Sequence, residues 1–496
     1  MEILKENNKN LAFGKNLEIP IEQPFMRNYK NLFWIVFVGF FLFQLISFLG
    51  YIAPSLSSLF FWLTLVATFY LTIKKIDYGL LILCFEFLAG HEGHLFSFAG
   101  ISLRLALFIT VMVVWFFSKR QAIKPSLIFS IFIFFLFLGL INGFTNSNPL
   151  FALKDFINFS YIFLVFPLID FLKDKQNHKD LFVISMALIF ALAILTIFVL
   201  ILFSTGLAQI HDIFYWWWRG TVIGKVTFAG NNFFRIVTPA HLLVLPLLLI
   251  YLRLWFTGDQ KKKILVGVII LATSALLINF SRAYFLGLFI GLLFLSFGLP
   301  SKKWFKFTAV FLLIMLSELI IIFASVSGGK TFGLDFFVGR MKTTVAPEEE
   351  LSSATRLAIL PVLLEKIKEK PILGHGLGMT VSYQDPETKE IKNTRHLDWG
   401  YLETMAELGV FGFLSFLTLI FSLFYKIFKR IKEFDLNEKR VVIGLGAGLI
   451  ALLVATATGP YIFHALGIFY LSLTMAYLEK KESSDNYQRI LVKESI

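Results

Sequence analysis

The sequence has little of what soluble or disulfide-stabilised proteins contain. Cys84 is the single cysteine among 496 residues, so no intrachain disulfide can form, and cysteine usage leaves the redox compartment undetermined. Charged residues make up 16% of the chain, against roughly 25% in soluble domains. Neither an internal repeat nor a low-complexity linker divides the chain, which favours one membrane domain over a repeat architecture.

Long apolar segments dominate the chain instead. Hydrophobic residues account for 57% of it, 60 residues are Phe, and the mean hydropathy is +0.75. Apolar runs of the ~20 residues needed to cross a bilayer recur along almost the whole chain. Phe, Leu and Ile surround the expected helices on all sides, as lipid-facing spans require. The composition therefore predicts an all-α polytopic membrane protein.

The apolar runs predict about 14 membrane spans, separated by short loops except for one large outer loop. The polar, basic residues before the first run, together with the length of that run, indicate an uncleaved span and not a signal peptide. The expected spans are 31–52, 55–73, 76–90, 96–117, 126–144, 150–172, 180–203, 233–256, 263–280, 283–299, 304–325, 404–427, 441–457 and 460–478.

Alternate loops differ in charge. Lys and Arg concentrate in segments 5–30, 74–75, 119–124, 173–179, 253–263, 302–306 and 426–440, whereas the opposite short loops 89–94, 142–149 and 459–460 contain neither residue. The positive-inside rule makes the basic set cytoplasmic, together with both termini. Basic cytoplasmic loops that attract anionic lipid and fix the topology account for the net charge of +13. No nucleic-acid partner is therefore expected.

This topology divides the chain into five segments. We expect a cytoplasmic tail at 1–30, a membrane domain at 31–325 and an outer loop with short helices at 326–403. Membrane helices at 404–478 and a second cytoplasmic tail at 479–496 complete the chain.

Arginines occur in outer loops that otherwise avoid positive charge, at W216-W-W-R219, N231-N-F-F-R235 and S281-R282. Arg219, Arg235 and Arg282 would each cost desolvation energy at a membrane boundary unless they meet an anion or snorkel. A guanidinium suits a pyrophosphate because its planar fork donates two hydrogen bonds and stays charged. Trp218 and its neighbours predict an aromatic belt and a surface for stacking sugars. The alternative is that each Arg anchors the chain at the headgroups.

The outer loop contains an amphipathic stretch that predicts a helix from Ser352 to about residue 370. Arg356 lies in its first turn, where the helix dipole disfavours a cation, so we expect either an anionic ligand or pairing with the acidic residues 348–350. G374-H-G-L-G378 follows without a preceding strand or a Walker lysine, which argues against nucleotide binding. Its glycines predict a tight turn that brings the backbone close to the membrane face, with His375 in a structural role.

The loop ends on R395-H396-L-D398-W-G-Y401, at the start of the next apolar helix. Asp398 is either the N-cap of that helix or a base that accepts a proton from an acceptor hydroxyl, and His396 is the other candidate base. We expect Arg395, Arg356 and Tyr401 to contact the substrate.

These residues resemble the O-antigen ligase and polymerase family over roughly residues 210–415. Ser281-Arg282 is similar to the motif that opens a span in that family, Arg235 to its other recurring Arg, and the segment from Arg356 to Gly412 to its outer loop. When Leu402, Glu407 and Gly409 are aligned with the family pattern, Asp398 stands where ligases have a His followed by Asn or Ser, which favours a polymerase.

The resemblance implies a GT-C-like fold and inverting transfer of a glycan from undecaprenyl pyrophosphate to a hydroxyl, without metal or cofactor. It also implies the bacterial cytoplasmic membrane, contacts with membrane lipids and a chain-length regulator as a partner. A ligase that passes the glycan to lipid A, protein or another surface acceptor is the close alternative. A transporter without catalysis is the third, with Glu86, Arg104 and Glu318 as candidate midplane charges, although no paired halves are evident.

The alternation of basic loops generates a topology prediction. A reporter fused after Glu348 is expected to be active outside the cytoplasm, and one fused after Glu433 in the cytoplasm, because the basic loops stay inside. Matched dual reporters for the two compartments measure both positions. The reverse result at either fusion would overturn the span order and the outer location of the 326–403 loop.

Overall fold

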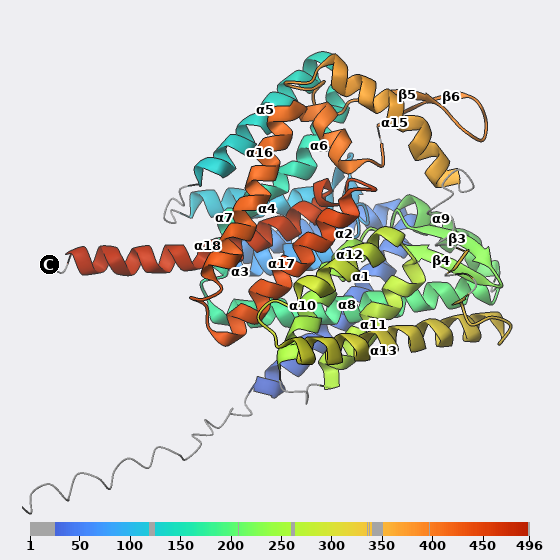
Figure 1. Ribbon diagram of the computed structural model, residues 1–496, viewed down its shortest axis with the longest axis horizontal. Helices are drawn as coiled ribbons and strands as arrows, with labels where there is room; N and C mark the ends of the chain where they lie inside the picture. The colour runs from blue at the N-terminus through green and yellow to red at the C-terminus, as the bar shows by residue number, and fades with distance from the viewer. Residues whose placement is uncertain are drawn as a thin grey trace, which may run out of the picture.

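The computed structural model describes residues 25–118, 125–206, 208–258, 263–334, 336, 338–339, 351–395 and 397–494. Helices dominate these residues, and three short antiparallel hairpins accompany them (Figure 1). The N-terminal helices are α1 (Phe25–Ile52), α2 (Pro54–Lys74), α3 (Ile76–Ala89), α4 (Leu103–Phe117), α5 (Leu127–Asn146), α6 (Pro149–Ser160), η1 (Tyr161–Leu164), α7 (Val165–Phe171), α8 (Lys175–Ser204) and α9 (Ala208–Gly220).

The remaining helices are α10 (His241–Thr257), α11 (Lys263–Asn279), α12 (Arg282–Phe294), α13 (Ser301–Ser327), α15 (Leu351–Glu369), α16 (Gly400–Arg430), α17 (Leu436–Thr456), η3 (Tyr461–Phe463) and α18 (Ala465–Glu494). The hairpins pair β1 (Ser97–Phe98) with β2 (Ile101–Ser102), β3 (Lys225–Gly230) with β4 (Phe233–Val237), and β5 (Val381–Gln384) with β6 (Ile391–Thr394).

Eight segments within the described residues are long and apolar enough to cross a membrane, and five shorter apolar helices accompany them. The long segments are Tyr29–Ile52, Pro54–Lys74, Leu127–Asn146, Pro149–Phe171, Lys175–Ser204, Ser301–Ser327, Gly400–Arg430 and Leu436–Thr456. The chain is therefore an all-α polytopic membrane protein, as its composition predicts. The count of about 14 spans stays a prediction.

Several expected spans are not single helices. The segment 233–256 begins with strand β4 and becomes helical only at His241, because the Asn231 and Asn232 backbones turn the chain with positive φ and pair β4 with β3. The segment 96–117 likewise begins with the β1–β2 hairpin, and 150–172 is α6, η1 and α7 in series. Hydropathy reports how apolar a stretch is, and an apolar strand satisfies it as well as a helix does.

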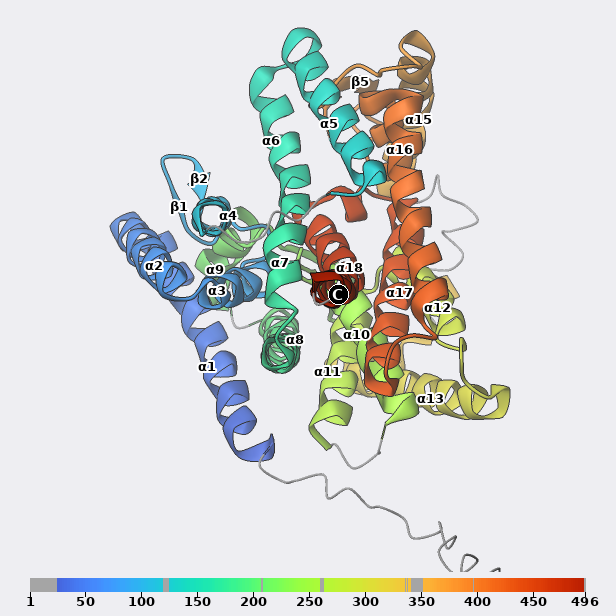
Figure 2. The same cartoon turned by 90° about the vertical axis from the view of Figure 1, so that its left-hand side faces the viewer.

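Small residues let the central helices pack closely. Helix α17 lies against α10 and α12 (Figure 2). A Cβ on Gly287 or Gly291 of α12 would lie 2.6 Å from the Ala451 oxygen or 2.4 Å from Leu249, respectively, so both positions admit only glycine without rearrangement. Close approach of this kind is how membrane helices gain packing energy when lipid already solvates their apolar side chains.

The elements expected outside the membrane gather on one side of the molecule. Helix α9, the β3–β4 hairpin, α15 and the β5–β6 hairpin lie at the right of Figure 1, while the far end of α18 extends to the left. The candidate site lies among the elements on this right-hand side.

Helix α16 is broken at Gly409, whose φ of 69° and ψ of 179° are not helical. The break removes helical partners from backbone groups on both sides of it, and such groups need replacements in an apolar surrounding. Residues 371–378, which we call the glycine clasp, supply them. His375 and Gly376 donate N–H bonds to the carbonyls of Ala406 (2.8 Å) and Glu407 (2.9 Å), and Val410 N–H donates to the Pro371 carbonyl (2.8 Å).

The glycine clasp also fastens α16 to α5 and α6. Leu377 N–H donates to the Gly139 carbonyl of α5 at 2.9 Å. At Gly376, where φ is +94°, a Cβ would lie 2.1 Å from the Gly143 nitrogen. The structure thus shows the tight, close turn that the glycines predict. It also gives His375 a structural contact, since its Nε2 lies 2.9 Å from the Lys366 carbonyl oxygen.

Gly376→Ala is expected to destabilise the protein by about 2–5 kcal/mol, of which about 1–2 comes from left-handed backbone strain and the rest from the clash with α5. Thermal unfolding in detergent measures the loss. Gly100→Ala is the matched control, because Gly100 has a φ of +81° and open space around its Cβ position. Equal losses at the two positions would show that the clasp does not press against α5.

Candidate functional site

Tyr461 lies at the centre of a charged cluster built from separate elements. It belongs to η3 and shares a side-chain hydrogen bond with Ser281. It also interacts electrostatically with Arg356, Asp398 and Arg235. A tyrosine phenol is neutral at physiological pH and can donate a hydrogen bond. Its ring packs edge-on against Tyr284, with centroids 5.4 Å apart.

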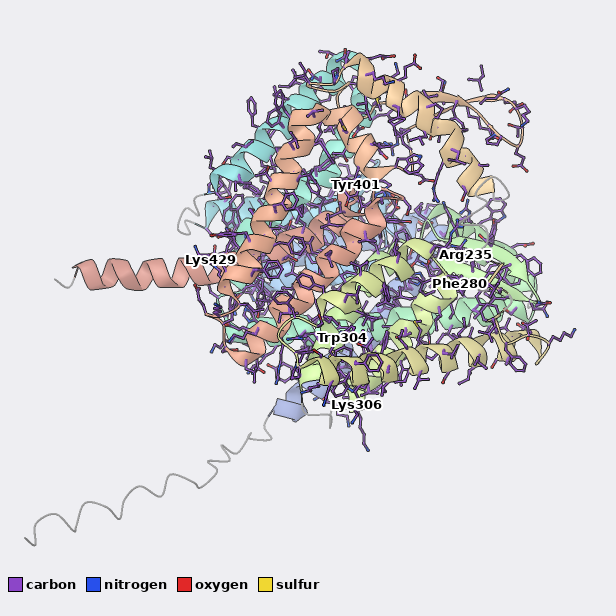
Figure 3. The ribbon with its side chains drawn as sticks, in the orientation of Figure 1. Arg235, Phe280, Trp304, Lys306, Tyr401 and Lys429 are labelled. Atoms are coloured by element: carbon purple, nitrogen blue, oxygen red, sulfur yellow. The ribbon has the colours of Figure 1, made fainter. Side chains whose placement is uncertain are left out.

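Arg235 is presented by the β3–β4 hairpin. In β4, Phe233 and Ile236 are buried while Arg235 is partly exposed, opposite Thr227 on β3. The Arg235 Nε donates to the carbonyl oxygen of Asn279 at 3.2 Å. Asn279 is the last residue of α11, so this contact satisfies a helix-end carbonyl. Figure 3 shows Arg235 and Phe280 close together.

Arg282 is the first residue of α12 and follows Ser281, the N-cap position. The helix dipole disfavours a cation at this end, so the stability of α12 does not explain why an Arg stands there. Its Nη2 donates to the Ser353 hydroxyl at 3.2 Å, which links α12 to α15.

Arg356 of α15 pairs with Asp398, with 3.4 Å between Nε and Oδ2. The Asp398 side chain is 50% exposed and that of Arg356 is 26% exposed, so ligands can reach the pair. Trp399 Nε1 donates to the Arg356 carbonyl at 3.0 Å and holds the two segments together.

The N-cap interpretation of Asp398 is wrong. Helix α16 starts at Gly400, and Trp399 occupies the cap position without a side-chain cap. Asp398 has a φ of +55°, a left-handed conformation that turns the chain two residues before the helix. A non-glycine residue in that region costs energy and points to a functional constraint.

Arg395 and Tyr401, two further candidate residues of this segment, contact α6 and α17, respectively. Arg395 Nη1 lies 3.7 Å from Asp155 Oδ1 of α6, and its guanidinium is 5.4 Å from the Phe151 ring. The Tyr401 hydroxyl donates to the Leu453 carbonyl at 2.5 Å, so it ties α16 to α17. His396 lies outside the described residues.

Trp218 does not offer the stacking surface expected of it. Its side chain is fully buried and stacks on Phe214, with centroids 5.7 Å apart. Helix α9 is amphipathic: it turns Trp217 and Trp218 inward, and Trp216 is the exposed member of the triplet. Arg219 at the helix end is exposed and donates through Nη1 to the Gly224 carbonyl at 3.3 Å.

Two carboxyl groups of α16, which the sequence analysis did not propose as site residues, follow Asp398 in the chain. Glu407 of α16 is buried and accepts a bond from the Gly378 N–H at 3.0 Å, while Glu403 lies one turn earlier. Within the described part of the chain, no three His, Cys, Asp or Glu side chains are grouped to hold a metal ion.

The charges that a transporter would use have partners inside the protein. Arg104 and Glu86 are both buried and lie 2.6 Å apart. Glu318 accepts a hydrogen bond from the Ser274 hydroxyl at 2.9 Å.

Tyr461 is the site residue that sequence reasoning missed. It follows Gly459-Pro460, the outer loop recognised only by its lack of Lys and Arg. No local motif marks it, because its neighbours in the cluster come from distant parts of the chain.

Part of the chain is similar to a known protein family. Residues 266–417 match the family model described as O-Antigen ligase. This segment contains Arg282, Arg356 and Asp398 and ends in α16, whereas Arg235 and Tyr461 lie outside it. No curated protein matches the chain.

Proposed function

We propose that this protein, whose residues 266–417 match the O-antigen ligase family model, polymerises oligosaccharide repeats carried on undecaprenyl pyrophosphate. The observation that carries the proposal is that α15 brings Arg356 to the exposed Asp398 carboxylate and Ser353 to Arg282. Tyr461, which bonds to Ser281, lies within electrostatic range of Arg356, Asp398 and Arg235. We place the reaction at the outer face of the bacterial cytoplasmic membrane, with both termini in the cytoplasm.

The arginines suit the leaving group of such a transfer. Arg235, Arg282 and Arg356 would hold the pyrophosphate oxygens, because a guanidinium stays charged and donates paired hydrogen bonds. The neutral Tyr461 phenol would donate a further hydrogen bond at the same place. Arg219 and Arg395 are proposed to contact the glycan beyond the pyrophosphate.

Asp398 would act as the base. As the acceptor hydroxyl attacks the anomeric carbon, the bond to the pyrophosphate oxygen breaks, a new carbon–oxygen bond forms on the opposite face, and the hydroxyl proton moves to the carboxylate. This is an inverting transfer in which the arginines stabilise the departing charge. We propose that the step needs no metal ion.

Purified protein with a lipid-linked repeat as sole substrate tests the function. A ladder of products identifies a polymerase. Absence of product until a second acceptor, such as lipid A, is added would replace that proposal with ligase activity, which the matched family's description favours. Movement of intact lipid-linked repeat across vesicles without any new linkage would indicate transport. Adding a chain-length regulator is expected to narrow the ladder.

Arg282→Ala is expected to reduce transfer roughly ten- to a hundredfold, because it removes a charge-assisted contact worth about 1.5–3 kcal/mol. Arg282→Lys is expected to rescue poorly, since an ammonium lacks the fork. Initial rates normalised to membrane level measure both variants. Lys225→Ala, which removes an exposed charge from β3, is the control and should leave the rate unchanged. Full activity of Arg282→Lys would make headgroup anchoring the better account.

Asp398→Asn is expected to lower transfer at least tenfold, since a positioned base contributes about 10²–10⁴-fold. Stability should change little, because an exposed ion pair contributes about 0–1 kcal/mol. Rates and thermal unfolding of the same preparations separate the two effects, with Asp385→Asn in the β5–β6 turn as the control. If Asp398→Asn stays fully active while His396→Ala is inactive, His396 is the base and the ligase alternative gains.

A further inference from the structure

His241 is the centre of a buried hydrogen-bond network. It is the first residue of α10 and is fully buried. Its Nδ1 lies 3.3 Å from the Thr238 backbone nitrogen and 2.9 Å from Asn279 Nδ2, and its Nε2 lies 2.9 Å from Thr196 Oγ1 on α8. Thr196 in turn donates its hydroxyl to the Leu192 carbonyl at 2.8 Å.

These contacts determine the tautomer. A backbone N–H and a side-chain amide both point at Nδ1, so Nδ1 must be the acceptor and Nε2 must carry the hydrogen. Thr196 has already used its own hydrogen, so its oxygen is free to accept the Nε2–H bond. Both ring nitrogens of His241 therefore have the donor or acceptor role that their neighbours need, which defines one orientation of the ring.

The network ends at the candidate site. The side chain of Asn279 is held by His241, and the carbonyl oxygen of the same residue accepts the bond from Arg235 Nε at 3.2 Å. The following residue, Phe280, is fully buried with a φ of +50° and packs against Phe336. His241 thus holds the side chain of Asn279, and the contact between Phe280 and Phe336 holds the backbone that follows the Asn279 carbonyl.

We propose that His241 is a positioning residue that sets the orientation of Arg235 through Asn279. The effect of His241 on pyrophosphate binding by Arg235 rests on the proposed function. The contacts that orient Arg235 do not depend on it. Small displacements of a charged hydrogen-bond donor such as Arg235 lower the transfer rate, because the reacting groups must be held in one arrangement. His241 touches no substrate and acts only through Arg235.

Two substitutions distinguish the roles of the ring nitrogens. In His241→Asn, the Oδ1 atom takes the place of Nδ1 and can accept from Thr238 and Asn279, so only the Thr196 contact is lost. In His241→Gln, the amide reaches the Nε2 position and leaves both donors at Nδ1 unpaired. The variants remove opposite halves of the network with side chains of similar chemistry.

The transfer assay gives the first test. His241→Gln is expected to raise KM for the lipid-linked donor about tenfold, the effect of one lost charge-assisted contact, whereas His241→Asn keeps most of the activity. In an Arg235→Ala background, His241→Gln should cause no further loss, since the two changes act through one contact. Tyr251→Phe is the control: it removes another buried bond between α10 and α8, from Tyr251 to Ser185 at 2.8 Å. It should lower thermal stability without changing KM.

A second test needs no transfer activity. Phenylglyoxal labels accessible guanidinium groups, and mass spectrometry of the substrate-free protein gives the rate at Arg235 relative to Arg219. His241→Gln is expected to raise the relative rate severalfold, and His241→Asn to leave it near that of the unmodified chain. An unchanged rate in His241→Gln, or additive losses in the Arg235→Ala background, would overturn the positioning role. A raised rate combined with full transfer by Arg235→Ala would keep the positioning role and overturn the part of the proposed function that gives Arg235 the pyrophosphate.

Discussion

The placement of α15 and its Arg356 depends on one break in helix α16. Gly409 interrupts α16, and the carbonyls of Ala406 and Glu407 then take their hydrogen bonds from the glycine clasp. Backbone groups cannot remain unpaired in an apolar surrounding, so the break and the clasp require one another. Because the clasp follows α15 directly, it also anchors the helix that carries Arg356 and faces it toward Asp398.

Hydrogen bonds to other elements of the fold orient two arginines of the candidate site. Arg235 is held by a helix-end carbonyl and Arg282 by a serine hydroxyl. Each contact fixes one guanidinium nitrogen against a residue that is distant in the sequence. Asp398 faces Arg356 in a left-handed turn two residues before α16, so it does not occupy the N-cap of that helix.

Local patterns predicted the helix of the outer loop and the tight glycine turn, because helical amphipathicity and positive φ are properties of neighbouring residues. They failed where an apolar segment had two ways to satisfy its backbone. Residues 233–237 became a strand, and only pairing with β3 decided that. Trp218 is buried because α9 lies against the protein, and the composition of the Trp triplet could not indicate which ring would face inward.

The sequence by itself determined the membrane class, the alternation of basic loops and the presence of arginines where lipid disfavours them. Those properties follow from side-chain transfer energies, which act residue by residue. The tertiary structure alone decided that Arg356 pairs with Asp398, that Arg282 contacts Ser353, and that Arg235 contacts the Asn279 carbonyl. Their contacts join segments far apart in the chain, and the physical reason they form is the packing of whole helices, to which no short stretch of sequence is sensitive.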